Sequence, residues 1–141
     1  MKKMLMMIAL CIGLTGCGDG NTKQASASVR ENGVEVLCFH GKQRCATCVA
    51  IERETAAVID GQFADAIADG VLEMRIIDIT KPENEALADK YEITWSSLVV
   101  VKYTDGGEQA ENLTKFAFAN ARNHPEVFRS ELTEKIKKLL E

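Results

Sequence analysis

The sequence has no excess of positive charge, no apolar run of membrane-spanning length and no nucleotide-binding turn, and each absence excludes a class of function. Its 141 residues carry 17 basic and 21 acidic side chains, a formal net charge of -4, so there is no basic surface for nucleic acid. The apolar run of residues 4–14 is too short to cross a bilayer as a helix. No glycine-rich dinucleotide turn follows any strand pattern. We therefore expect protein or small-molecule partners and no cofactor.

The first residues have the pattern of an export signal. Lys2 and Lys3 precede the apolar run of residues 4–14, as the positive and apolar regions of a secretory signal peptide do. The run ends in Leu-Thr-Gly-Cys at residues 14–17, which resembles the lipobox of bacterial lipoproteins. This resemblance implies cleavage before Cys17 and lipidation of its thiol.

These features predict three parts: a lipoprotein signal peptide over residues 1–16, a lipidated flexible tether over residues 17–32 and one folded domain over residues 33–141. The tether is rich in Gly, Ser, Ala, Asn and Gln and has no apolar period. Two or more acyl chains anchor a protein stably, since each buried CH₂ contributes about 0.8 kcal/mol. The predicted location is the cell envelope, anchored to the inner or outer membrane through lipid alone, with the domain facing the periplasm or the cell surface.

The cysteines indicate a redox pair. Export places the domain in an oxidising compartment, where disulfides persist. Of the five cysteines, Cys11 leaves with the signal peptide and Cys17 takes the lipid, so three remain. Cys45 and Cys48 are three positions apart before an apolar-periodic segment, and at that helical spacing two sulfurs meet on one face. Cys38 is left over in an apolar run, where we predict that it packs as a small hydrophobe.

The surroundings of the pair are those of a reactive thiol. At a helix N-terminus, free backbone N–H groups and the helix dipole stabilise a thiolate at Cys45, and Arg44 adds a neighbouring cation. Apolar residues then recur at steps of three and four, so Cys48 is expected to face inward as the resolving thiol. The same period places residues 52–54 (Glu-Arg-Glu) on the solvent side.

The rest of the domain alternates strand and helix patterns. A strand over residues 34–39 is followed by the dithiol helix with a possible break at residues 60–61, and by an apolar strand over residues 71–79 that we expect to be covered on both faces. A short helix begins at Pro82, and a hairpin turns on residues 105–107. Residues 114–122 fit loop and helix equally. The last helix begins at Pro125, with its inward residues predicted to be Val127, Phe128, Leu132, Ile136, Leu139 and Leu140.

This order, β-α-β-α-β-β-α with a C-x-x-C motif between the first strand and helix, resembles the thioredoxin superfamily over residues 34–140. The resemblance implies an α/β fold of three layers with a mixed central sheet. A narrower likeness is carried by Phe-His-Gly at residues 39–41, Arg-Cys-Ala-Thr-Cys at 44–48 and Trp-Ser-Ser at 95–97. These resemble the nitrophenyl-compound nitroreductase subunits of the ArsF-like family, which implies a nitroreductase partner.

Two departures from the thioredoxin pattern bear on the site. Ala46 and Thr47 stand between the cysteines where thioredoxins have Gly-Pro, and Ser97 takes the place of a cis-proline before the third strand. A cis bond before a residue other than proline costs about 2.5–4 kcal/mol, so we predict a trans peptide at Ser97. The resemblance also implies that Trp95 lines a groove over the dithiol. His40 is either a proton partner of Cys45 or the plain end of its strand.

The sequence thus predicts an enzyme, an envelope thiol–disulfide oxidoreductase in which Cys45 attacks and Cys48 resolves. Its expected partner is a protein disulfide or dithiol, and the domain is expected to be a monomer. Two alternatives stay open. One is a soft-metal module that uses Cys38, Cys45, Cys48 and His40. The other is a non-catalytic interaction domain that keeps a structural disulfide.

Overall fold

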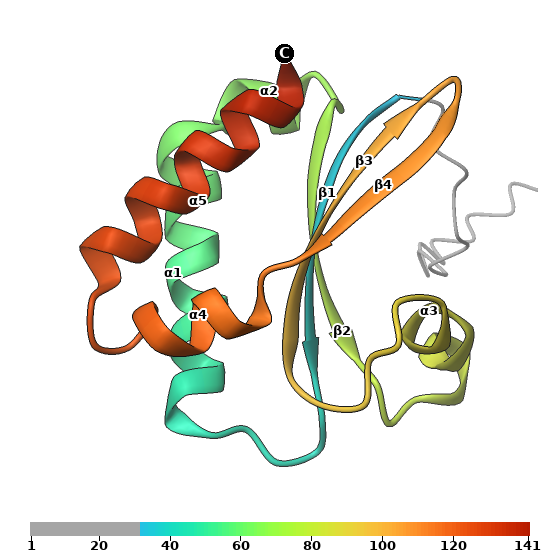
Figure 1. Ribbon diagram of the computed structural model, residues 1–141, viewed down its shortest axis with the longest axis vertical. Helices are drawn as coiled ribbons and strands as arrows, with labels where there is room; N and C mark the ends of the chain where they lie inside the picture. The colour runs from blue at the N-terminus through green and yellow to red at the C-terminus, as the bar shows by residue number, and fades with distance from the viewer. Residues whose placement is uncertain (1–31) are drawn as a thin grey trace, which may run out of the picture.

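The computed structural model describes residues 32–141, so Cys17 and the predicted signal peptide lie outside the described residues. In chain order the elements are β1 (Gly33–His40), α1 (Ala46–Gln62), α2 (Ala64–Ala68), β2 (Leu72–Asp78), the 3₁₀ helix η1 (Pro82–Asn84), α3 (Glu85–Lys90), β3 (Ser97–Thr104), β4 (Gly107–Asn112), α4 (Thr114–Asn120) and α5 (Pro125–Leu140) (Figure 1). The predicted order is confirmed, and the segment that fitted loop and helix equally contains α4. No helix between residues 32 and 141 is both long and apolar enough to cross a membrane.

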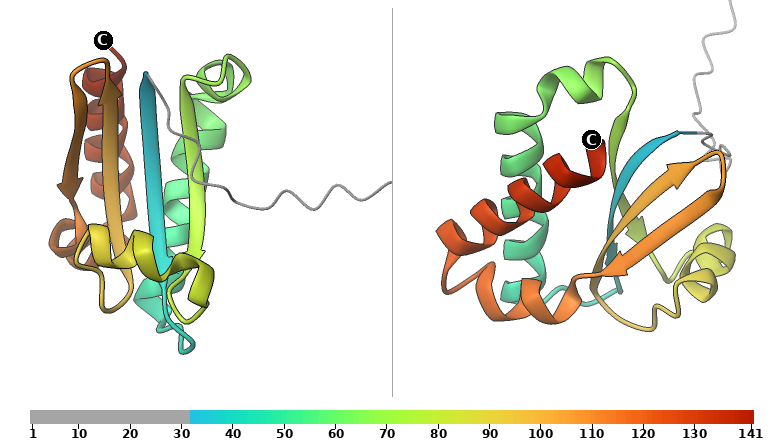
Figure 2. Two further views of the ribbon diagram at one scale, coloured as in Figure 1. Left: turned by 90° about the vertical axis from the view of Figure 1, so that its right-hand side faces the viewer. Right: turned by 45° about the horizontal axis from the view of Figure 1, so that its top comes forward.

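The four strands form one mixed sheet in the order β2-β1-β3-β4. β1 pairs in parallel with β2 and antiparallel with β3, and β4 folds back on β3 as the predicted hairpin. Helices α1, α2, α4 and α5 lie on one face of this sheet and α3 lies on the other, as Figure 2 shows. The predicted thioredoxin-like fold of three layers is therefore confirmed.

β1 is the central strand of the core because both of its faces are covered. Val34, Val36 and Cys38 point into the cluster formed with α1, α4 and α5. Leu37 and Phe39 alternate to the other face and pack with α3. This double coverage explains the apolar run of residues 36–39. It also fixes the position of the chain segment that leaves β1 toward α1.

Three expectations differ from the structure in detail. β2 pairs only with β1, so it is an edge strand, and Ile76 is 53% exposed rather than covered. Val127 is also exposed, whereas Phe128 and its neighbours one and two turns later are buried. The break in the dithiol helix falls at Phe63, later than predicted, because Phe63 buries its ring in the core and its N–H still bonds to Ile59.

Glu54 is the clearest error of the helical pattern, because it was expected in solvent and is only 2% exposed. Its carboxylate accepts from Nε of Arg129 on α5 at 2.5 Å and from Nε of Arg53 at 2.9 Å. Burial raises the pKa of Glu54, but the hydrogen bonds from the two guanidinium groups outweigh it and lower the pKa below its ordinary value. The residue therefore links α1 to α5 as a carboxylate.

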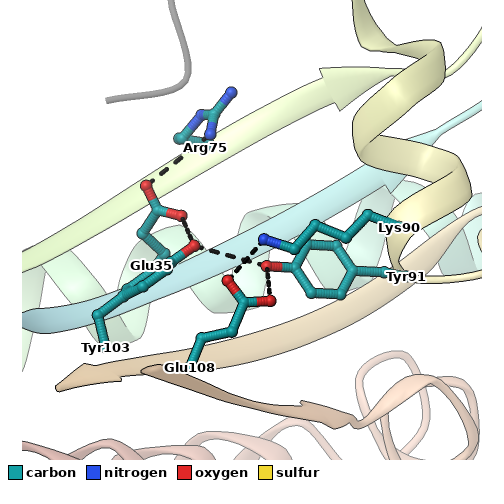
Figure 3. Close-up of polar contacts among 6 residues, drawn as sticks. All are labelled: Glu35, Arg75, Lys90, Tyr91, Tyr103 and Glu108. Atoms are coloured by element: carbon teal, nitrogen blue, oxygen red, sulfur yellow. Dashed lines mark hydrogen bonds and ion pairs between the residues drawn. The ribbon is translucent and has the colours of Figure 1, made fainter. Parts of the chain in front are cut away.

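A second polar network occupies the α3 face of the sheet, as Figure 3 shows. Its centre is Glu35 of β1, which is 4% exposed. The Tyr103 hydroxyl donates to Oε2 of Glu35 at 2.8 Å, and Arg75 lies 3.8 Å from Oε1. The network continues through Tyr91 to Glu108, whose other oxygen pairs with Lys90 at 2.6 Å. Burial, followed by the hydrogen bonds to Tyr91 and Glu35, raises the pKa of Tyr103.

Candidate thiol–disulfide site

Cys45 is the residue that caps the N-terminus of α1. β1 ends at His40, and a short connection leads to Cys45, whose backbone is extended, with φ -72° and ψ 161°. Its Sγ accepts the backbone N–H of Cys48 at 3.0 Å. This is the contact that a Ser or Asp oxygen makes at an ordinary N-cap. A thiolate at this position is stabilised by that N–H group and by the positive end of the helix dipole.

Cys45 and Cys48 are joined by a disulfide with their Cα atoms 5.0 Å apart, well inside the range that a disulfide needs. Cys45 is exposed and Cys48 is partly buried. An incoming sulfur therefore reaches Cys45 more easily than Cys48. Their assignment as attacking and resolving thiols stays a prediction, and these exposures are the ones that the two roles require.

The charge of Arg44 is shared with an acidic partner. Its guanidinium forms an ion pair with the carboxylate of Glu52, one helical turn after Cys48. The negative charge of Glu52 offsets the field of Arg44 at Cys45. The ion pair with Glu52 therefore weakens the contribution of Arg44 to a thiolate at Cys45.

An open groove of about 380 Å³ runs past the dithiol. Its lining consists of Gly41, Gln43, Cys45, Cys48, Ile79, Thr94, Trp95, Ser96 and Phe118. Trp95 is 57% exposed, and its ring lies 5.0 Å from that of Phe118 on α4. The structure thus places Trp95 beside the dithiol. The sequence analysis missed Phe118 because residues 114–122 gave no clear helical pattern.

A much smaller cavity lies behind the dithiol, and it contains two residues that the sequence singled out. His40 and Ser97 line it together with Cys38, Phe39, Cys48, Ile51, Glu52 and Ser96. The half-buried His40 ring donates from Nδ1 to the Gly41 carbonyl at 3.0 Å. His40 therefore borders the cavity that Cys48 also lines, and it does not line the groove. Ser97 is buried and donates to the Trp95 carbonyl at 3.1 Å.

Ser96, the middle residue of the Trp-Ser-Ser motif, lines both the groove and the cavity. Ser96 therefore borders the groove, whereas Ser97 lines the cavity alone. The peptide bond before Ser97 is trans, since residues 32–141 contain no cis bond. Ser96 directly precedes β3, and Ser97 is its first residue.

Cys38 is buried in the core, as predicted, with 4% of its surface exposed. Burial raises the pKa of its thiol to about 12, and the Thr55 hydroxyl and the Arg44 guanidinium counteract part of this rise. Within residues 32–141, no three Cys, His, Asp or Glu side chains gather as metal ligands would. In the disulfide form, Cys45 and Cys48 have no thiolate to offer a metal.

The chain is similar to two solved thioredoxin structures. It is 17% identical to chloroplastic thioredoxin z, with 76% of this chain and 78% of that chain covered and a TM-score of 0.47. It is 18% identical to oxidized mitochondrial thioredoxin 3 from Saccharomyces cerevisiae, with 77% and 80% covered and a TM-score of 0.44. No family model and no curated protein matches the chain. The narrower likeness to the ArsF-like family thus gains no support.

We assign the fold from the strand order, the strand pairing and the arrangement of helices on the two faces of the sheet. An exposed sulfur at an N-cap, with a second sulfur one helical turn away, can take part in thiol–disulfide exchange in either direction. The described part of the chain therefore has a thioredoxin-like fold that carries an accessible disulfide at the start of its first long helix.

Proposed function

We propose that the protein is a thiol–disulfide oxidoreductase that exchanges its Cys45–Cys48 pair with a disulfide or dithiol of another protein. The observation that carries this proposal is the exposed Sγ of Cys45, which accepts the N–H of Cys48 at 3.0 Å at the helix N-terminus. A sulfur in this position is stabilised as a thiolate, which is the attacking species in disulfide exchange. A purely structural disulfide would have no need of this exposure.

In the reductive direction, the Cys45 thiolate attacks one sulfur of the substrate disulfide, and the other substrate sulfur leaves as a thiolate. The partly buried Cys48 then attacks Sγ of Cys45. This second step closes the Cys45–Cys48 bond and releases, as a thiolate, the substrate sulfur that Cys45 had attacked. Two electrons pass from the dithiol to the substrate. The reverse sequence oxidises a substrate dithiol, and the reduction potentials of the two pairs decide the direction.

The groove supports a polypeptide as the substrate. Trp95, Phe118 and Ile79 form an apolar wall next to Cys45, and exposed aromatic rings of this kind contribute to the binding of peptide segments. The open shape leaves room for an extended chain on both sides of the reacting sulfur. We propose a target cysteine flanked by at least one apolar residue.

The proposed setting is the cell envelope, with the protein a monomer attached by lipid at Cys17 to the inner or outer membrane. The support comes from the sequence of residues 1–17, which has the pattern of a lipoprotein signal. The narrower kinship with nitroreductase subunits adds no chemistry to the proposal, because the sequence has no dinucleotide-binding turn.

The test is the reduction of insulin by the purified chain with dithiothreitol as the electron source. We expect the wild type to accelerate reduction, Cys45→Ser to lose all activity, and Cys48→Ser to accumulate a mixed disulfide with insulin. The matched control is Cys17→Ser, which changes a cysteine far from the dithiol in sequence and should keep the activity. Reduction by Cys45→Ser at the rate of the wild type would reject the mechanism. A chain that instead holds zinc or copper and does not reduce insulin would favour the soft-metal module.

A further inference from the structure

A third thiol lies next to the dithiol. Cys38 is the free cysteine among residues 32–141, and its side chain lines the small cavity that Cys48 also lines. Cys38 is on β1 and Cys48 is in the first turn of α1, so the strand and the helix present two sulfurs to one space. The exposed Cys45 lies on the other side of the dithiol, in the groove.

The Thr55 hydroxyl is a second, independent feature of this place. Thr55 is fully buried on α1, and its Oγ1 has no oxygen or nitrogen partner among the described residues. It faces the Cys38 thiol, whose pKa it lowers, and the Arg44 guanidinium acts in the same direction. A buried hydroxyl without a partner is costly. A thiolate at Cys38 would accept a hydrogen bond from the Thr55 hydroxyl and remove that cost.

We propose that Cys38 is a third redox thiol that exchanges with the Cys45–Cys48 disulfide to form a Cys38–Cys48 disulfide. The Cys38 thiolate attacks Sγ of Cys48, the Cys45–Cys48 bond breaks, and Cys45 leaves as a thiolate. The proton lost by Cys38 passes to solvent. One disulfide forms and one breaks, so the step needs no external oxidant or reductant.

The exchange changes what the groove presents to a substrate. Cys45 becomes a free, capped thiolate while its resolving partner is held by Cys38. This consequence rests on the proposed function, because it concerns the mixed disulfide that Cys45 forms. Such a mixed disulfide would persist until Cys48 is released. Burial keeps the Cys38 thiol largely protonated, so the exchange is slow.

The sequence provides a direct assay of this exchange. Trypsin cuts after Arg30, Lys42, Arg44 and Arg53, which places Cys38 on the peptide 31–42 and both dithiol cysteines on the peptide 45–53. The Cys45–Cys48 disulfide is therefore internal to one peptide. A Cys38–Cys48 disulfide joins two peptides, and mass spectrometry of the alkylated, unreduced digest distinguishes them.

The experiment oxidises the full chain carrying Cys45→Ser with glutathione disulfide. We expect most of Cys48 in the monomer band to appear in the linked peptides 31–42 and 45–53. The link should fall to background in Cys38→Ala/Cys45→Ser and form more slowly in Thr55→Val/Cys45→Ser. Circular dichroism confirms that each variant is folded. The outcome that overturns the proposal is a folded Cys45→Ser variant in which Cys48 stays free or carries glutathione and no Cys38–Cys48 link forms.

The insulin assay separates this result from the proposed function. A wild type that reduces insulin, together with a Cys45→Ser variant without the link, overturns only the third thiol. A Cys45→Ser variant with the link, together with a wild type that does not reduce insulin, supports the third thiol and overturns the proposed function.

Discussion

At the residue scale, the conformation of Cys45 decides the chemistry of the site. Its extended backbone places Sγ where a capping oxygen usually lies, so the sulfur receives the N–H of Cys48. The geometry ties the reactivity of one thiol to the backbone of the second cysteine. It also explains why two residues between the cysteines suffice, since the N-cap and the third helical residue are one turn apart.

Trp95 is predicted to act in substrate binding and not in the chemical step. Replacing it with Ala removes an exposed ring that packs on Phe118. An aromatic contact contributes about 1 kcal/mol, so KM for a peptide disulfide should rise about fivefold. The rate with a small disulfide that does not fill the groove should be unchanged, and Trp95→Phe serves as the matched control. Equal KM values for the wild type and Trp95→Ala would show that the groove does not bind the peptide.

At the scale of helices and strands, two buried carboxylates connect elements that are distant in sequence. Glu54 links α1 to α5 through Arg129, and Glu35 links β1 to β3 through Tyr103. Helical period predicted Glu54 on the solvent side because it lies at the edge of the apolar face. Its partner is 75 residues away, and no local pattern reveals such a pairing.

Glu54→Gln should destabilise the domain by about 1–2 kcal/mol at neutral pH, a value discounted because both guanidinium groups are largely exposed. The folded pKa of Glu54 is lowered, so this stabilisation is present above the ordinary glutamate pKa of about 4.3 and is lost as the pH falls through the folded value. The urea midpoints of the wild type and Glu54→Gln should therefore differ at neutral pH and converge in acid. The control is Glu131→Gln at an exposed position of α5, and a difference independent of pH would contradict the ion pair.

Tyr103→Phe should lower the free energy of unfolding by about 1–3 kcal/mol, because the buried carboxylate of Glu35 loses the hydroxyl that donates to it at 2.8 Å. Tyr91→Phe is the matched control, since its hydroxyl lies at 3.3 Å and 3.5 Å from its partners, and it should cost less. Urea unfolding of both variants measures the difference. A larger loss for Tyr91→Phe would place the centre of the network at Glu108 instead of Glu35.

At the scale of the whole molecule, the site forms where β1, the start of α1, the turn into β3 and α4 meet at one end of the sheet. Three chain segments separated by dozens of residues contribute Cys45, Trp95 and Phe118 to one groove. β1 begins at Gly33, and the domain boundary at residue 33 stays a prediction. The predicted anchor precedes the described residues and is testable by itself.

Cys17→Ser should move the protein from the membrane fraction to the soluble fraction, because the substitution removes the thiol that would carry the lipid. In bacteria fed labelled palmitate, the wild type should incorporate label and the variant should not. Cys11→Ser, a change within the predicted signal peptide, is the matched control and should keep both label and membrane attachment. Label on Cys17→Ser would refute the lipid site.

The sequence alone determined the features that depend on neighbouring residues. Apolar runs and helical periods predicted the strands, the order of elements and the long helices, because burial on one or both faces imposes those periods. The spacing of Cys45 and Cys48 predicted a disulfide at a helix N-terminus, since one turn of helix sets the distance between them.

Only the tertiary structure decided which distant residues share a space. The position of β2 at the edge of the sheet exposes Ile76, and α4 brings Phe118 onto Trp95. The packing of α1 on β1 brings Cys38 and Cys48 to one cavity. Periodicity reports which side of an element is apolar, but the neighbour on that side depends on strand order and on how the layers pack, and those are properties of the whole chain.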